Sequence, residues 1–162
     1  MYLMNQILKI EILNYHLEVR NIESVKIYLS GSMSGVTFEE QTKWRQKVMD
    51  AIKFGYEHEK NVSFFNPVSY YNFKEKRYKN EREVMEFDLY NLRNSDLIIA
   101  NFNNVWSIGT AMELMLAKEL RIPIVGWNSS NEELHPWLTE CVTRMCEDIK
   151  EAVEYVVEFY LN

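Results

Sequence analysis

SDLIIANFNNVWSIGTAMELMLAKELRIPIVGW, residues 95–127, predicts two buried strands joined by a loop and by a helix that begins near Gly109. Both strand runs are apolar throughout, which is typical of strands covered on both faces. The helix carries one acid on an apolar face, because apolar residues follow Glu113 at i+3, i+4 and i+7: Leu116, Ala117 and Leu120. A carboxylate in such a place indicates a special structural or chemical role.

The composition predicts one domain with a small-molecule ligand. A chain of 162 residues, 47% of them hydrophobic, is long enough for one well-buried domain and too short for two ordinary ones. The 18 basic and 24 acidic residues give a net charge of -6, which argues against a nucleic-acid polymer as the partner. A small, locally recognised ligand is therefore favoured.

The cysteines and the hydropathy pattern predict a cytoplasmic protein. Cys141 and Cys146 fit neither a disulfide framework nor the spacing of a zinc site, so we interpret them as reduced thiols. The three histidines are too scattered to suggest a metal site. No apolar run approaches the roughly 18 residues that span a bilayer, and two glutamates interrupt the apolar start of the chain, unlike a signal peptide.

Two segments divide the chain. Residues 1–24 read as an N-terminal extension whose pattern fits a strand or a helix, and as an apolar arm it would pack on a partner subunit. From residue 25 to 162 the pattern predicts one domain in which strands and helices alternate. We expect strands at 25–30, 62–65, 96–100, 122–127 and 142–145, and helices at 38–54, 81–93, 109–120 and 148–160. The aperiodic run 70–82 is predicted to be a surface loop near the site.

This alternation predicts the fold. Apolar strands separated by helices indicate a five-stranded parallel sheet with helices on both faces. Right-handed crossovers then favour a doubly wound, Rossmann-like or flavodoxin-like α/β fold with strand order 2-1-3-4-5. In that order ligands collect where the first and third strands end. The loops 31–35 and 101–109 would line this crevice, and the Glu113 helix would begin beside it.

Glu113 has two readings. Thr110 and Glu113 have the spacing of a capping box, in which the glutamate bonds back to the first helical amide. The apolar neighbours instead place the carboxylate toward packed surface, where desolvation would raise its pKa while the helix N-terminus would keep it ionised. An ionised acid that faces a crevice is a candidate nucleophile.

Asp88 is the second candidate acid. It shares a helix face with Met85, Leu89 and Leu92, whereas the other acids of that helix look solvated. The alternative is an acid at the edge of the apolar face with its carboxylate in water. Two carboxylates from different helices at one crevice suit glycosidic chemistry, in which one attacks or stabilises the anomeric carbon and the other manages a proton.

The loop GSMSG, residues 31–35, could bind a phosphate or a sugar hydroxyl through its amides and the hydroxyls of Ser32 and Ser34. A tight turn without a ligand is the alternative. The loop is neither GxGxxG nor a Walker A sequence, which disfavours dinucleotides and nucleoside triphosphates. Ser107 could add a hydroxyl at the next helix N-terminus, where anions are favoured.

Four segments in order resemble the nucleoside 2-deoxyribosyltransferase family: IYLSGSMSG at 27–35, FFNP at 64–67, MEFDLYNLRNSDLIIANF at 85–102 and SIGTAMELMLAKELRIPIVGW at 107–127. The similarity runs from about Lys26 to the C-terminus, including HPWLTE at 135–140. It implies that Glu113 is the nucleophile that forms a covalent deoxyribosyl enzyme. It also implies that Asp88 protonates the departing base and that Tyr28 orients the nucleophile.

The resemblance also implies a substrate site and no cofactor. Ser107 stands where the transferases have a base-binding aspartate, and a serine there is more similar to deoxynucleoside-monophosphate N-glycosidases, which bind a 5'-phosphate. His135 aligns near an asparagine that the transferases receive from a neighbouring subunit, so a homo-oligomer, a dimer or larger, is expected. The expected substrate-binding residues are Gly31, Ser32, Met33, Ser34, Asn66, Ser107, Gly109 and His135.

Three functions follow from this resemblance. The first is cleavage of the N-glycosidic bond of a 2'-deoxynucleoside with transfer of the sugar to another nucleobase. The second is hydrolysis of a nucleoside or deoxynucleoside 5'-monophosphate to free base and sugar phosphate, since water in place of the second base would make the same site a hydrolase. The third is a non-catalytic nucleotide-binding sensor that keeps the fold.

Overall fold

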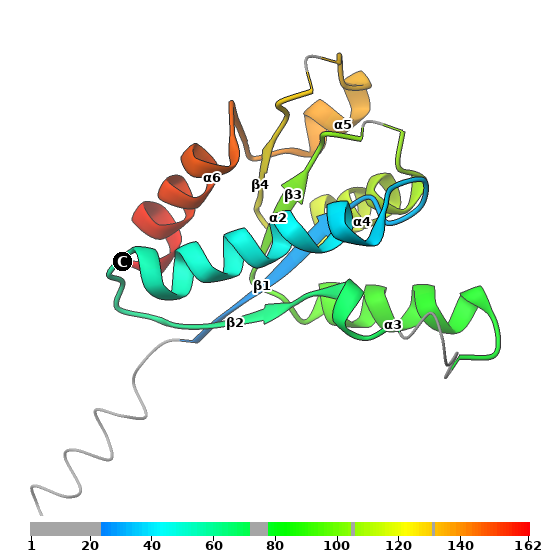
Figure 1. Ribbon diagram of the computed structural model, residues 1–162, viewed down its shortest axis with the longest axis horizontal. Helices are drawn as coiled ribbons and strands as arrows, with labels where there is room; N and C mark the ends of the chain where they lie inside the picture. Colours follow the sequence, from blue (N-terminus) through cyan, green and yellow to red (C-terminus); the bar gives the residue numbers. More distant parts are fainter. Residues whose placement is uncertain (1–23, 72–77, 105, 131) are drawn as a thin grey trace, which may run out of the picture.

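The computed structural model describes residues 24–71, 78–104, 106–130 and 132–162 (Figure 1). Five parallel strands form one sheet in the order β2-β1-β3-β4-β5. The strands are β1 (Ser24–Gly31), β2 (Asn61–Phe65), β3 (Leu97–Asn101), β4 (Ile124–Trp127) and β5 (Arg144–Cys146). The predicted strand order is confirmed. The extension expected at 1–24 lies outside the described residues except for Ser24, and so does the part of the predicted surface loop at 72–77.

Helices cover both faces of the sheet, as predicted. They are α2 (Phe38–Asp50), α3 (Glu81–Arg93), α4 (Ile108–Glu119), α5 (Pro136–Cys141) and α6 (Ile149–Val156). Helices α2 and α6 pack on one face, and α3, α4 and α5 pack on the other (Figure 1). Two π-helical turns, Ala51–Gly55 and Val157–Leu161, extend α2 and α6. Helix α3 has the predicted bounds.

The alternation of β1 divides its side chains between two cores. Ile27 and Leu29 pack against α2 and α6, whereas Tyr28 packs with α3 and α4 on the opposite face. Ser30 follows Tyr28 at i+2 and therefore points to the same face. This alternation brings two hydroxyl groups to the α4 side of the central strand.

Strand β1 is longer than its neighbour β2. The two strands pair from Ser24 to Tyr28, where Tyr28 lies opposite Phe65. Strand β2 ends there because Pro67 starts a 3-10 turn and cannot continue a ladder. Strand β1 pairs with β3 as far as Gly31. Its last three residues therefore have a strand on one side only.

Three local predictions are wrong. The pattern predicts no helix between 127 and 148, but α5 forms there, capped by the His135 side chain with Pro136 at the first position. Leu120 and Met85 were assigned to apolar packed faces, but their exposed fractions are 44% and 39%. Both lie on the solvent side of their helices, so the apolar faces are narrower than periodicity suggested.

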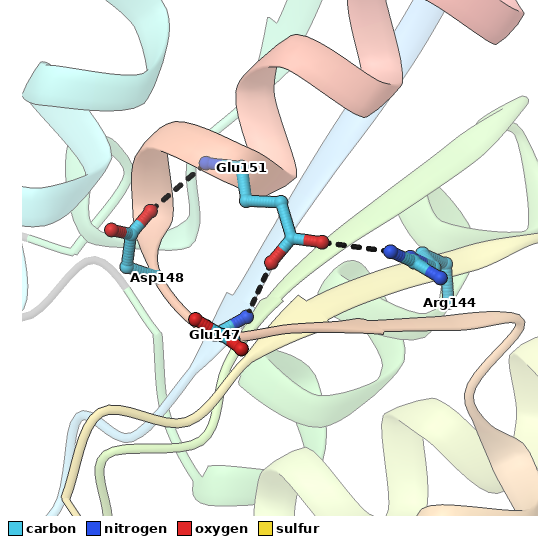
Figure 2. A network of polar contacts seen from close by, with 4 residues as sticks. All are labelled: Arg144, Glu147, Asp148 and Glu151. Carbon is cyan, nitrogen blue, oxygen red and sulfur yellow. Dashed lines mark hydrogen bonds and ion pairs between the residues drawn. The ribbon is translucent and has the colours of Figure 1, made fainter.

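Helix α6 begins with a polar network (Figure 2). The Asp148 carboxylate accepts hydrogen bonds from the amides of Lys150 and Glu151, which caps the helix. The Glu151 carboxylate accepts from the Glu147 amide and from the Arg144 guanidinium, both at 2.7 Å. The network fixes the turn between β5 and α6 at the surface, away from the candidate site.

Within the described ranges, no helix combines the length and apolar character that crossing a bilayer requires. In the same part of the chain, no three His, Cys, Asp or Glu side chains come together as metal ligands would.

Candidate active site

Glu113 is held by two hydroxyl groups of β1. The Tyr28 phenol donates to its Oε1 at 2.8 Å, and the Ser30 hydroxyl donates to its Oε2 at 2.6 Å. Tyr28 and Ser30 are themselves fully buried. Both carboxylate oxygens thus have fixed donors, which sets the orientation of the acid relative to the sheet.

The capping-box reading of Glu113 is wrong. Helix α4 begins at Ile108, and Ser107 is the residue that caps it, accepting a hydrogen bond from the Thr110 amide. Glu113 is therefore the sixth residue of the helix instead of the third. Its carboxylate faces β1 and cannot serve the first helical amides.

Burial dominates the ionisation of Glu113. It raises the pKa of this carboxyl to about 7, although the hydrogen bonds from Ser30 and Tyr28 lower it. The charge of Asp88 raises the pKa of Glu113 further. The helix N-terminus was expected to keep the acid ionised, but its field is strong only within the first turn, which Glu113 lies beyond.

Asp88 is a buried acid with a phenol as its partner. Its exposed fraction is 6%, so the reading of an edge acid with its carboxylate in water is wrong. The Tyr71 phenol donates to its Oδ1. Burial raises the pKa of Asp88 to about 6, against the lowering effects of the Tyr71 hydrogen bond and the Arg45 charge. The two acids come from α3 and α4 and lie close enough to affect each other.

The loop 31–35 is tied to the loop after β3. The Ser32 hydroxyl donates to the Ser34 carbonyl at 2.9 Å and accepts from the Asn104 side chain at 3.1 Å. The side-chain amide of Gln41 donates to the Met33 carbonyl at 2.7 Å. Ser32 therefore fixes the loop through its own hydroxyl, and the two loops of the predicted crevice are joined across it.

Gly31 and Gly35 meet different demands in this loop. A Cβ on Gly31 would lie 2.8 Å from the Trp44 ring, so only glycine allows this approach. Gly35 has a φ of 76°, which favours glycine by conformation instead. Both glycines thus serve the path of the loop as it leaves β1.

Ser107 and His135 line one cavity of about 680 Å³ between α4 and α5. Glu113, Asp88 and Tyr28 are not among its lining residues. Within one chain, this cavity thus brings Ser107 and His135 together, and the acids do not line it.

Gly109 lies in the first turn of α4, and Asn66 lies at the turn after β2. A Cβ on Gly109 would stand in open space. The Asn66 side chain accepts from the Val68 amide at 3.2 Å and so caps the turn that ends β2. Its neighbour Phe65 stacks on Tyr28 with ring centroids 5.2 Å apart.

Three residues around the acids were not predicted from the sequence: Ser30, Tyr71 and Arg45. Ser30 could have been found, because the alternation of β1 places it on the face of Tyr28. Tyr71 and Arg45 carried no such signal, since one lies in an aperiodic run and the other among the polar residues of α2.

Comparisons of the sequence with models of protein families and with curated proteins give no match. Comparison with solved structures gives several matches. The 2-deoxyribosyltransferase of the psychrotolerant bacterium Bacillus psychrosaccharolyticus matches with a TM-score of 0.63 and 19% identity, over 80% of this chain and 91% of that one. A conserved protein of Enterococcus faecalis V583 matches with a TM-score of 0.66 and 16% identity, over 83% and 98%. This chain has the fold of the nucleoside 2-deoxyribosyltransferases.

A CMP N-glycosidase of Clostridium botulinum also has this fold, with a TM-score of 0.50 and 16% identity over 83% of this chain and 99% of that one. In the deoxyribosyltransferase fold of the present chain, Glu113 lies beside the carboxyl end of β1. The strand order reverses between β1 and β3, which is where ligands bind in open α/β sheets.

Proposed function

We propose that the protein cleaves the N-glycosidic bond of 2'-deoxynucleosides and transfers the sugar to a second nucleobase. One observation carries the proposal. Two buried acids come from different helices, the charge of Asp88 reaches Glu113 beside the end of β1, and both oxygens of Glu113 are held by hydroxyl donors. The fold it shares with a 2-deoxyribosyltransferase and a CMP N-glycosidase supports chemistry at a glycosidic carbon.

The proposed reaction has two displacements at C1'. The Glu113 carboxylate forms a bond to C1' while the bond from C1' to the base nitrogen breaks, and the base leaves with that electron pair and a proton from Asp88. A nitrogen of the second base then attacks C1', which releases the Glu113 carboxylate, and Asp88 takes the proton of the incoming base. Tyr28 and Ser30 orient the nucleophile throughout.

The reactive form requires Glu113 ionised and Asp88 protonated. Since burial raises the pKa of Glu113 to about 7 and that of Asp88 to about 6, this form is a minor one that is most populated between those values. We therefore expect a bell-shaped dependence of kcat/KM on pH with its maximum between pH 6 and 7.

The second candidate function is hydrolysis of deoxynucleoside 5'-monophosphates. Ser107 favours it, because its hydroxyl accepts from the Thr110 amide and hydroxyl at the start of α4 and so keeps its own proton to donate. Anions are favoured at such a helix start. In either function we propose that Gly31, Met33, Ser34, Asn66 and Gly109 lie along the substrate. A non-catalytic nucleotide sensor is the third candidate.

One experiment separates these functions. The protein is incubated with deoxyinosine and adenine, and separately with deoxynucleoside 5'-monophosphates, and the products are resolved by chromatography. Deoxyadenosine supports the transferase, whereas free sugar alone or turnover of the monophosphate alone contradicts it. The Glu113→Gln variant is the control, since it should bind the nucleoside and produce nothing; binding without turnover by both proteins would indicate the sensor.

We also propose that the protein is a homo-oligomer. The cavity between α4 and α5 is surrounded by exposed apolar side chains, with exposed fractions of 83% for Trp106, 77% for Ile108 and 79% for Trp137. Patches of this kind favour burial against another subunit. His135 of one copy would then reach the site of its neighbour. A monomer by light scattering at working concentration would contradict this proposal.

A further inference from the structure

Arg45 is a fully buried cation on the opposite face of the sheet from the acids. Its exposed fraction is 0%, and it is the largest fully buried side chain in the described part of the protein. Among the described residues no carboxylate lies within ion-pair distance of it. An arginine is costly to bury without a carboxylate partner, so its place needs a reason.

The guanidinium binds three backbone carbonyl groups. Its Nη2 donates to the Gly31 carbonyl at 2.8 Å, its Nη1 to the Gln41 carbonyl at 2.6 Å and its Nε to the Leu29 carbonyl at 3.4 Å. It also lies over the Trp44 ring, with its Cζ 4.4 Å from the centroid. Each of the three guanidinium nitrogens thus donates to a backbone carbonyl.

These carbonyls belong to the part of β1 that extends past β2. Strand β2 ends opposite Tyr28, so the carbonyl groups of Leu29 and Gly31 need another donor. Arg45 supplies it from α2. The residue between them is Ser30, whose hydroxyl binds Glu113 on the other face. The guanidinium therefore fixes the strand segment that positions the candidate nucleophile.

The charge of Arg45 acts in the same direction as its hydrogen bonds. Burial lowers the pKa of Arg45 to about 10, so the group stays a cation at neutral pH. The opposite charge of Arg45 lowers the pKa of both Glu113 and Asp88. It is thus a fixed positive charge across the sheet from a pair of acids that burial would otherwise drive further toward the protonated form.

We propose that Arg45 is a positioning residue of the active site, which holds the carboxyl end of β1, and with it the Ser30 donor to Glu113, in place from behind the sheet. This inference rests on the proposed function. It differs from a purely structural role, because a structural arginine would stabilise the fold without changing the titration of Glu113.

Two variants separate the geometry of Arg45 from its charge. Arg45→Lys keeps the charge but replaces the planar fork with a single ammonium, and Arg45→Met keeps the length but removes the charge. The titration of Glu113 is followed by carboxyl NMR on protein labelled with 13C-glutamate, where its signal is identified by its absence in Glu113→Gln. Turnover of deoxyinosine with adenine is measured on the same samples.

We expect Arg45→Met to raise the midpoint of Glu113 titration by about one pH unit, the usual scale for charges that are near but not in contact. Arg45→Lys should leave the midpoint in place and lower kcat about tenfold or more through misplacement of the nucleophile. Arg144→Met is the matched control, because it removes a guanidinium from the surface network of Figure 2 and should change neither quantity.

A wild-type midpoint in Arg45→Met, or wild-type turnover in Arg45→Lys, would overturn the inference. If Arg45→Met does not fold, Arg45→Gln provides a second neutral variant that keeps a donor for the carbonyls. The NMR titration does not depend on turnover. If the wild-type protein were inactive on every nucleoside, the proposed function would be contradicted. The NMR titration would still decide whether Arg45 affects Glu113.

Discussion

Replacing Ser30 with alanine removes one of the two hydrogen bonds to Glu113. The lost bond is the 2.6 Å contact from the serine hydroxyl to Oε2, and it favours the ionised form of the acid. Alanine fits the site because Ser30 is fully buried and the change only removes one atom. Oε2 would then be left in a buried place without a protein donor.

The size of the effect follows from the strength of that bond. A hydrogen bond to a charged group contributes roughly 1.5–3 kcal/mol, and 1.36 kcal/mol corresponds to one pKa unit. Because the bond stabilises only the ionised form to this extent, its loss should raise the pKa of Glu113 by about 1–2 units from about 7. On the acid limb, kcat/KM follows the ionised fraction of Glu113 and should fall about tenfold to a hundredfold at each pH, pH 6.5 included. The alkaline decline of kcat/KM should begin about 1–2 pH units higher.

The assay is the dependence of kcat/KM on pH for transfer from deoxyinosine to adenine. Ser95→Ala is the matched control, because Ser95 is also buried and its hydroxyl donates to the Asn91 carbonyl at 2.8 Å, away from the acids. Its acid limb should stay in place. If Ser30→Ala folds and its acid limb coincides with that of the wild type, Ser30 does not favour the ionised nucleophile and the reasoning fails.

Three further predictions concern the acids and the packing of the sheet. Asp88→Asn should lower kcat about 10²–10⁴-fold and abolish the decline of the rate on the alkaline side of its maximum, which a pH–rate profile measures; a decline that persisted would mean that another group donates the proton. Folding raises the pKa of Glu113 from the ordinary 4.5 to about 7, so the stability linked to this group is fully present below pH 4.5 and is lost as the pH rises through 7. Over this window the melting temperature should decline less in Glu113→Gln than in the wild type. Parallel melting curves for the two proteins would refute the assignment. Gly126→Ala would place a Cβ 2.3 Å from the Phe102 ring and should lower the free energy of unfolding by about 1–3 kcal/mol in urea. Gly55→Ala, whose Cβ would make only an ordinary contact with Ala51 at 4.0 Å, should have little effect; equal effects would contradict the overpacking.

Long periodic runs made most of the fold predictable. The strand order, the bounds of α3 and the inward positions of Glu113 and Asp88 each depend on a pattern that several residues repeat. Helix α5 has six residues, which is too few to carry a period, and its start at His135-Pro136 resembles a turn.

The polar partners of the acids were less predictable, because they come from other elements. Tyr71 contacts Asp88 from an aperiodic run, and Arg45 contacts the end of β1 from a helix 14 or more residues further along the chain. Ser107 and Glu113 show a different difficulty. Both Ser107 and Thr110 are residue types that suit a helix cap, and in the structure Ser107 is the cap.

The alternation of β1 has one more consequence. Tyr28 and Ser30 reach Glu113 only because they occupy every second position of this strand. A slip of one residue in its pairing would present Leu29 to the carboxylate and bury Ser30 in the apolar core under α2 and α6. Enzymatic activity would therefore depend on the correct register of the central strand. A single-residue insertion before Tyr28 within β1 should abolish activity, whereas the same insertion in a surface loop should be tolerated.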